Sequence, residues 1–232
     1  MSEGGFGHGA HGRLTEHDLG RFTGDSLFDR LGRAVCRAGC LPRKELFEAW
    51  EMARRVRRIL RGGRVVDLGG GHGLLAHVLL LLDDTSPEAL VVDLTLPPSH
   101  ARVHEALLLE WPRLKGRVGF EERPYEDVPL EAGDLVVASH ACGALTDTVI
   151  ELAVAAGAPV AVLPCCHDHV RCDTGSLTGW MPADLAIDAV RALKLREAGY
   201  RVWTKAIPAE VTPKNRLLIA APAAAAAIDD LA

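Results

Sequence analysis

The sequence predicts a single α/β domain with a mainly parallel sheet and helices on both of its faces. From residue 64 onward, short apolar runs rich in Val, Leu and Ala alternate with longer runs whose apolar residues recur at helical spacing. A glycine-rich run, VVDLGGGHG, stands where the first short run gives way to a helical one. Because parallel strands need right-handed crossover connections, this alternation places helices on both faces of the sheet.

The first 62 residues precede the alternating part of the chain. Residues 1–24 are rich in Gly and His and show no apolar periodicity, so we expect a mobile arm there. Residues 25–62 are expected to form a helical arm or lid. Within them, Pro42–Arg61 carries apolar residues at helical spacing, and the pair Gly62 and Gly63 supplies a stop.

Residues 63–222 are predicted to form the main domain, and residues 223–232 a flexible, alanine-rich tail. Strands are expected at 64–68, 90–94, 117–122, 134–140, 159–165, 200–206 and 216–221. Helices are expected at 74–82, 102–111, 145–156 and 183–198.

Composition and charge narrow the class of protein. The chain has 232 residues, of which 48% are hydrophobic and 25% charged, as in globular proteins, and no apolar run is long enough to span a membrane. The N-terminus lacks the apolar segment of a secretion signal, so we expect a cytoplasmic protein with six reduced cysteines. A net charge of -5 gives no overall attraction to nucleic acid.

The glycine-rich run points to a nucleotide-containing ligand. Asp67, Gly69, Gly71 and Gly73 occupy alternate positions at the predicted turn from strand to helix. Glycines there let the backbone approach a ligand closely, and the helix that follows offers free N–H groups. A dinucleotide-binding loop would read G-x-G-x-x-G, which would require a third glycine at Leu74 if the pattern starts at Gly69.

The pattern Asp-x-Gly-x-Gly-x-Gly resembles motif I of the class I methyltransferases that use S-adenosylmethionine. The resemblance implies a Rossmann-like, seven-stranded sheet whose last strand is antiparallel, with S-adenosylmethionine as cofactor and S-adenosylhomocysteine as product. It implies that the loop Gly69–Gly73 holds the amino-acid end of the cofactor, with Asp67 nearby. Asp93 matches the family's ribose ligand, and Tyr125 and Glu126 fall where the family contacts adenine.

Two further segments, SHACGALTD at residues 139–147 and LPCCHDHVRC at residues 163–172, end the fourth and fifth predicted strands. Both should lie at the carboxyl edge of the sheet, where open α/β sheets bind ligands. We expect them to face the methyl group, with Ser139 close to the cofactor. His140 is the first candidate for a general base and His167 the second, and Asp168 could orient or replace them.

The motifs His-x-Cys-Gly-x-x-Thr-Asp and Cys-Cys-His resemble a methyltransferase subfamily that includes eukaryotic tRNA ribose 2′-O-methyltransferases acting on the acceptor stem. The resemblance covers residues 64–221 and implies an RNA ribose 2′-hydroxyl as acceptor. A small-molecule methyltransferase with the N-terminal helices as its lid is the alternative. A non-catalytic protein that binds S-adenosylmethionine is a third interpretation, and a nicotinamide-dependent oxidoreductase is the remaining rival.

The cysteines and histidines of the second segment also raise the question of a metal. Cys165, Cys166, His169 and Cys172 are weak candidates for zinc ligands. Adjacent cysteines at a strand end tend to point to opposite faces, and no paired C-x-x-C spacing occurs. We therefore predict small buried thiols near the cofactor and no metal. Catalysis by Cys142 or Cys166 as a covalent nucleophile is a weaker alternative.

A cluster of arginines ends the predicted N-terminal helix. Its members Arg54, Arg57, Arg58 and Arg61 are candidates for contacts to RNA phosphates beside the active site. The alternative is a solvated helix face, whose arginines interact favourably with the dipole at the C-terminal end of the helix.

Overall fold

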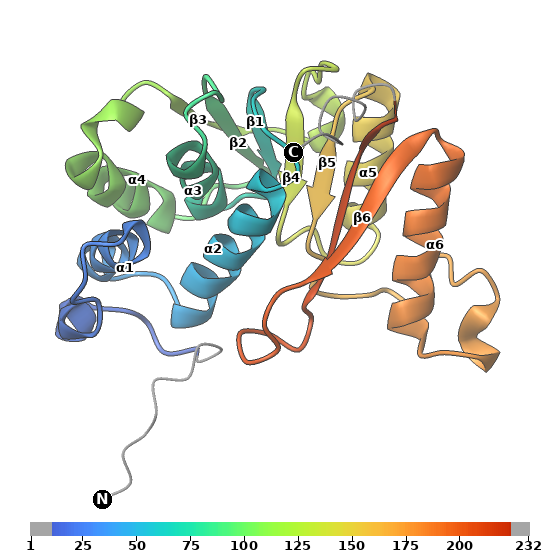
Figure 1. Ribbon diagram of the computed structural model, residues 1–232, viewed down its shortest axis with the longest axis horizontal. Coiled ribbons are helices and arrows are strands. Elements are labelled where there is room, and N and C mark those ends of the chain that lie inside the picture. The colour runs from blue at the N-terminus through green and yellow to red at the C-terminus, as the bar shows by residue number, and fades with distance from the viewer. Residues whose placement is uncertain (1–10, 224–232) are drawn as a thin grey trace, which may run out of the picture.

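The computed structural model describes residues 11–223, which form a seven-stranded sheet flanked by helices (Figure 1). The strands are β1 (Val65–Leu68), β2 (Ala89–Asp93), β3 (Val118–Glu122), β4 (Leu135–Ala138), β5 (Val160–Val162), β6 (Tyr200–Ala206) and β7 (Arg216–Pro222). The α-helices are α1 (Leu27–Ala38), α2 (Arg43–Arg57), α3 (Leu74–Leu82), α4 (Ser99–Glu110), α5 (Leu145–Ala156) and α6 (Ala183–Glu197). The 3-10 helices are η1 (Glu16–Arg21), η2 (Pro112–Leu114), η3 (Tyr125–Asp127) and η4 (Leu177–Gly179).

The strand order is β3-β2-β1-β4-β5-β7-β6, with β7 antiparallel to both of its neighbours. Strands β1 to β5 are mutually parallel where they pair. This topology confirms the predicted fold class, including the antiparallel last strand. The order of winding reverses between β1 and β4, so the crevice for a ligand lies outside the carboxyl ends of these two strands.

The two faces of the sheet bury different sets of side chains because successive strand residues point to opposite sides. In β1, Val65 belongs to the hydrophobic cluster that contains α1 to α4. Val66 and Leu68 belong to the cluster that contains α5 and α6. Asp67 alternates with Val66 and Leu68, and therefore points to the face that the N-terminal helices cover.

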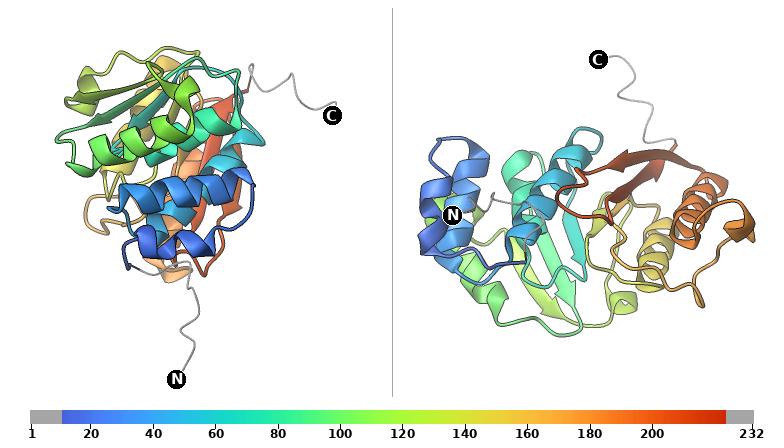
Figure 2. Two further views of the ribbon diagram at one scale, coloured as in Figure 1. Left: turned by 90° about the vertical axis from the view of Figure 1, so that its left-hand side faces the viewer. Right: turned by 90° about the horizontal axis from the view of Figure 1, so that it is seen from below.

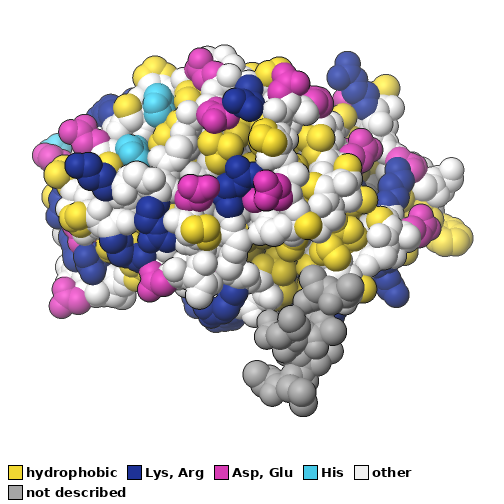
Figure 3. All heavy atoms as spheres, turned by 90° about the horizontal axis from the view of Figure 1, so that it is seen from above, with side chains coloured by type: hydrophobic (Ala, Val, Ile, Leu, Met, Phe, Trp, Pro, Cys, Tyr) yellow, Lys and Arg dark blue, Asp and Glu magenta, His cyan; other side chains and the backbone are white. Residues whose placement is uncertain are grey.

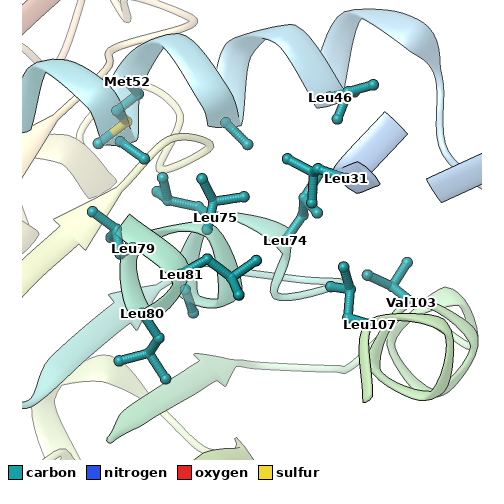
Figure 4. Packing of buried hydrophobic residues seen from close by; sticks show 14 of the residues in the cluster. Leu31, Leu46, Met52, Leu74, Leu75, Leu79, Leu80, Leu81, Val103 and Leu107 are labelled. Carbon is teal, nitrogen blue, oxygen red and sulfur yellow. The ribbon is translucent and has the colours of Figure 1, made fainter. Parts of the chain in front are cut away.

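The N-terminal helices are an integral layer of this domain. Helix α2 packs on α3 and α1 packs on α4, as both views of Figure 2 show. Leu46 and Met52 of α2 face the leucines of α3 (Figure 4). Helix α3 is leucine-rich and almost wholly buried because α2 covers the side that faces away from the sheet.

The segment before α1 differs from the expected mobile arm. Leu14 is 0% exposed, and its backbone N–H donates to the carbonyl of Leu41 at 2.9 Å. The N–H of Arg43 in turn donates to the carbonyl of Gly12 at 3.0 Å, and Phe22 is buried in the same cluster. Residues 11–24 are therefore held by packing that has no local periodicity. The rest of the predicted arm, residues 1–10, and most of the predicted tail lie outside the described residues.

Strands β4 and β5 end earlier than the sequence predicts, at Ala138 and Val162. The residues that follow, including His140 and Cys165, lie in irregular chain and are free of the strand alternation. Among the described residues, no helix has both the length and the apolar character needed to cross a lipid bilayer.

Candidate active site

The glycine loop Gly69–Gly73 joins β1 to α3. Gly69, Gly71 and Gly73 have φ angles of 73°, 48° and 74°, which residues other than glycine rarely adopt. A Cβ atom on Gly69 would lie 2.9 Å from the Tyr125 hydroxyl oxygen, and one on Gly73 would lie 2.8 Å from the Phe120 ring. A Cβ on Gly71 would meet nothing closer than 3.9 Å. Two of the glycines are thus required by packing, whereas a Cβ on Gly71 would make only ordinary van der Waals contacts.

Asp67 lies directly beneath this loop. Its side chain is 0% exposed, and neither carboxylate oxygen makes a hydrogen bond of normal geometry. Burial raises the pKa of Asp67 to about 7, and the nearby backbone N–H of Ala76 opposes that shift. Burial of a carboxyl group destabilises the fold when no hydrogen bond offsets the loss of its hydration. The site therefore holds an unsatisfied acceptor against Gly70 of the loop.

Asp93, at the end of β2, faces the same loop. One carboxylate oxygen accepts from the Gly71 N–H at 3.2 Å and the other from the Leu94 N–H at 2.8 Å. Tyr125 lies close by in η3, where burial first, and then Asp93 and Asp67, raise its pKa to about 12. Glu126 is exposed and Ser139 is buried. The structure thus gathers the predicted residues Asp67, Asp93 and Tyr125 around the loop.

His140 follows β4 on the other side of the loop. The next residue, Ala141, has its backbone nitrogen 3.8 Å from the position of a Cβ on Gly69. His140 is exposed to solvent, yet the protein that surrounds its imidazole lowers its pKa by desolvation, while Glu45 and Glu48 of α2 oppose the shift. A neutral imidazole that protein surrounds and solvent reaches is suited to accept a proton.

Helix α2 contributes ionisable groups that the sequence did not predict for the site. Glu45 contacts His72 of the glycine loop, with Oε2 and Nε2 2.5 Å apart. Glu48 is 4% exposed and pairs with Lys44 at 3.0 Å, while its Oε2 atom has no hydrogen-bond partner. His72 lies inside the glycine-rich motif, so the sequence alone could have identified it as a candidate site residue. The α2 residues had no such signal, because their role depends on where α2 packs.

His167 and Asp168 occupy positions that fit base catalysis poorly. The His167 side chain is 1% exposed, and its Nε2 lies 2.8 Å from an oxygen of Asp188 in α6. An imidazole enclosed in this way cannot reach an acceptor. One oxygen of Asp168 accepts from the N–H groups of Val170 and Arg171, so this carboxylate shapes its own loop. Both residues stabilise the connection from β5 to α6.

The cysteines are arranged differently from the expectation. The sulfur atoms of Cys142, Cys165 and Cys166 all lie within 4.8 Å of one another. The inference that adjacent cysteines point apart was wrong here, because β5 ends at Val162 and Cys165 and Cys166 lie in irregular chain. The other two predicted ligands lie elsewhere: Cys172 contacts Arg191, and His169 contacts Asp184. Burial is the main cause that raises the pKa of Cys142 and of Cys165.

The arginine cluster is largely neutralised and lies far from this site. Arg57 is 3% exposed and pairs with Asp83 at 3.1 Å, so its predicted contact to RNA is wrong. Arg54 pairs with Glu51, whereas Arg58 and Arg61 are exposed. From Glu45 to Arg58, a rise of about 1.5 Å per helical residue gives roughly 20 Å. On the face shown in Figure 3, basic and acidic side chains are interspersed.

The glycine loop at the switch point, with an acidic residue at the end of the next strand, defines an α/β protein that binds a nucleotide-containing cofactor. A family model described as a methyltransferase domain matches residues 48–173, more than half of the sequence. The chain belongs to this family, and it is an enzyme whose cofactor is S-adenosylmethionine.

Solved structures show the same fold. An O-methyltransferase structure from Nostoc punctiforme PCC 73102 is 16% identical with a TM-score of 0.51, and the match covers 83% of this chain and 59% of that one. The mitomycin 7-O-methyltransferase MmcR is 16% identical with a TM-score of 0.50, and covers 88% of this chain and 60% of its own. The chain thus spans about three fifths of both. A comparison with curated proteins finds no match.

The described residues fit S-adenosylmethionine. The cofactor carries a cationic sulfonium and an ammonium group, and the buried carboxyl of Asp67 has unused acceptor capacity below the loop. Gly71 adds no side chain of its own at this point of the loop, where the side-chain atoms of Asp93 and Pro97 come no closer than 3.9 Å to the position of a Cβ. Asp93 presents a carboxylate at the end of β2, where ribose hydroxyls can donate to it.

Proposed function

We propose that the enzyme methylates a hydroxyl oxygen on a compact acceptor, with His140 as the general base. The observation that carries this proposal is the position of His140 beside the glycine loop, facing Glu45 and Glu48 of α2 and His72. Helix α2 thereby borders the acceptor side of the site, and the N-terminal layer acts as its cover.

Bound S-adenosylmethionine supplies a methyl group on a cationic sulfur, which is a good leaving group. In our proposal the loop Gly69–Gly73 and Asp67 hold its amino-acid end, and Asp93 accepts hydrogen bonds from the ribose. The adenine side is bordered by Tyr125 and Glu126, and Ser139 lies under the cofactor at the end of β4.

His140 would take the proton that the acceptor hydroxyl loses as the new bond to carbon forms. Glu45 and Glu48 both favour the charged imidazole, so they stabilise the imidazolium that results. Lys44 and His72 act in the opposite direction and keep the imidazole neutral before the reaction. The α2 residues thus orient and tune His140 without contacting the acceptor oxygen themselves.

A compact acceptor is favoured over RNA by the charges around the site. Glu45 and Glu48 place carboxylates where a polyanion would have to approach, and the exposed arginines are at the opposite end of α2. An RNA ribose 2′-hydroxyl remains the second candidate because of the His-x-Cys-Gly and Cys-Cys-His motifs. A second observation supports RNA as acceptor. A hollow of about 410 Å³ is lined in part by the basic side chains of Arg54, Arg55, Arg58 and Lys205.

The test is the transfer of radiolabelled methyl groups from S-adenosylmethionine into a metabolite extract and, in parallel, into total small RNA with a nuclease-treated control. We expect label in the metabolite extract, in a product that mass spectrometry identifies as a methyl ether rather than a methylated amine. Label that enters RNA and vanishes with nuclease would replace the compact acceptor by the ribose hydroxyl. Methylamine products from either sample would contradict hydroxyl methylation altogether.

A further inference from the structure

Three cysteine side chains converge where β4 and β5 end, and neither the methyl-transfer step nor cofactor binding uses them. Cys142 follows β4, and Cys165 and Cys166 follow β5. Their sulfur atoms all lie within 4.8 Å of one another, and the Cys142 and Cys165 sulfurs are 2.8 Å apart. We call these three residues the thiol triad.

The backbone holds the two loops of the thiol triad together. The N–H of Gly143 donates to the carbonyl of Cys166 at 3.1 Å, directly beside two members of the triad. The N–H of Leu163 donates to the carbonyl of Ala138 at 2.9 Å, which extends the pairing of β4 and β5 toward the triad. The convergence therefore follows from the sheet pairing and is more than a chance contact of mobile side chains.

We propose that the thiol triad binds one zinc ion through three thiolates and leaves a fourth coordination position open. Zinc with sulfur ligands at about 2.3 Å requires sulfur atoms about 3.8 Å apart in a tetrahedral arrangement. In the triad the Cys142 and Cys165 sulfurs are 2.8 Å apart, and no two of the three sulfurs are more than 4.8 Å apart. Small side-chain rotations at partly exposed residues can close this difference.

The chemistry of the ligands selects a soft metal ion. Thiolates favour zinc over magnesium, calcium or manganese, which prefer oxygen ligands. Three thiolates this close repel one another, and a divalent cation offsets that repulsion while three protons leave to solvent. Lys44 offers a further positive charge near Cys142, which balances the net negative charge of a zinc ion with three thiolates.

The proposed ion would lie on the acceptor side of the cofactor loop. Cys142 is close enough to Tyr125 to influence its ionisation, and the Tyr125 hydroxyl borders Gly69. His140 stands two residues before Cys142 in the chain, and Lys44 is near enough to influence the ionisation of both, so the triad lies near the proposed general base. Three protein ligands with an open position are typical of catalytic zinc sites, whereas structural sites are closed by four.

The test is a titration of the reduced, chelator-treated full chain with Co²⁺, which substitutes for zinc and reports its ligands by absorption. We expect one equivalent to bind with the strong near-ultraviolet band of thiolate ligands and the visible bands of tetrahedral cobalt, and Zn²⁺ to displace it. Replacement of Cys166, which is exposed and tolerates a polar side chain, by Cys166→Ser should remove the tetrahedral spectrum. Cys165→Ser should do the same.

Cys40→Ser is the matched control, because Cys40 is a partly buried cysteine outside the triad. It should retain the cobalt spectrum of the wild type, and circular dichroism should show that all variants are folded. Absence of a stoichiometric thiolate band in the reduced wild type would overturn the proposal. So would a spectrum that survives in folded Cys165→Ser, or a chain that only forms a Cys142–Cys165 disulfide and binds no Co²⁺ after reduction. The readout is metal binding alone, so the outcome is independent of the methyl acceptor.

Discussion

Asp67 combines full burial with a carboxyl group that has no regular hydrogen bond. Such a group is tolerated when a ligand supplies the missing interaction, and it is destabilising until then. In our proposal the cationic S-adenosylmethionine supplies that interaction, so an ionised Asp67 would gain more from the bound cofactor than from the empty fold. The residue thus links stability, pH and cofactor binding.

Replacement of Asp67 by Asn should stabilise the cofactor-free protein at alkaline pH. The pKa of about 7 in the folded state exceeds the ordinary value of 3.8, so the folded state retains a proton that the unfolded state loses between these pH values. Stability of the wild type therefore falls as pH rises through this window. Relative to wild type, Asp67→Asn should gain a few kcal/mol between pH 4 and pH 8, since one pKa unit corresponds to about 1.36 kcal/mol.

Denaturant unfolding at both pH values measures this gain, and the exposed Asp84→Asn variant is the control for loss of a carboxylate at the surface. The same Asp67→Asn substitution should weaken S-adenosylmethionine binding. A stability difference that does not grow with pH would show that Asp67 is already ionised or paired in the folded chain.

His140→Ala should lower turnover with little effect on cofactor affinity. A positioned general base contributes about 10²- to 10⁴-fold to the rate, and our proposal places His140 on the acceptor side of the loop. Steady-state turnover and calorimetric binding of S-adenosylmethionine on the same preparations separate the two effects. The exposed His17→Ala variant should behave as the wild type. An unchanged rate in His140→Ala would remove this residue as the base.

At the scale of secondary-structure elements, helix α2 runs from the candidate site at its N-terminal end to a buried ion pair at its C-terminal end. Its first turns place Glu45 and Glu48 at the site, and its last turn is fixed by the buried pair of Arg57 and Asp83. Arg57 also donates to the Leu79 carbonyl at the end of α3 and to the Ser86 hydroxyl. This anchor determines how α2 lies across α3, and hence where Glu45 reaches.

Arg57→Ala should destabilise the fold by about 3–5 kcal/mol, the usual cost when one partner of a buried ion pair is removed and the other charge stays behind. Asp83 would be that remaining charge. Thermal and denaturant unfolding measure the effect, and the neighbouring exposed Arg58→Ala variant should differ little from the wild type. Equal stabilities for the two variants would show that the buried Arg57–Asp83 pair does not stabilise the fold.

Several elements could be predicted closely from local sequence, and others could not. The bounds of α3, α5 and β6 agree with the prediction because glycines or prolines punctuate a clear apolar period nearby. The ends of β4 and β5 were predicted too late: β4 ends at Ala138, before the polar Ser139 and His140, and β5 ends at Val162 although the apolar Leu163 follows. That difference matters for the thiol triad, because the strand alternation assumed for Cys165 and Cys166 does not apply to irregular chain.

At the scale of the whole molecule, the residues of the proposed cofactor side could be singled out from the sequence, and those of the proposed acceptor side mostly could not. Asp67, the glycine loop and Asp93 belong to short consecutive segments whose spacing carries the signal. The acceptor side is assembled from α2, the glycine loop and the chain after β4, which are far apart in sequence. Burial of Arg57, packing of Leu14 and convergence of three cysteines likewise depend on tertiary contacts alone.

The N-terminal layer and the sheet form one unit because they share a hydrophobic core. One hydrophobic cluster runs from Leu14 and α1 through α2 and α3 to the sheet, so the cover over the acceptor side is part of the main core. A ligand that binds only the folded chain stabilises it by about 2.7 kcal/mol at a concentration 100 times its dissociation constant. Saturating S-adenosylmethionine should therefore raise the melting temperature of the whole domain in a single transition.

The central claim is that the loop Gly69–Gly73 binds the cofactor at Gly71, which adds no side chain, and calorimetric titration of S-adenosylmethionine into Gly71→Val tests it most directly. Gly116→Val is the matched control, because Gly116 also has a left-handed φ, of 74°, and a Cβ at neither glycine would meet an atom closer than 3.9 Å. Both variants pay comparable backbone strain, of about 1–2 kcal/mol. We predict that Gly71→Val loses measurable binding while Gly116→Val binds as the wild type. Near-normal affinity in folded Gly71→Val would contradict the assignment of the cofactor site.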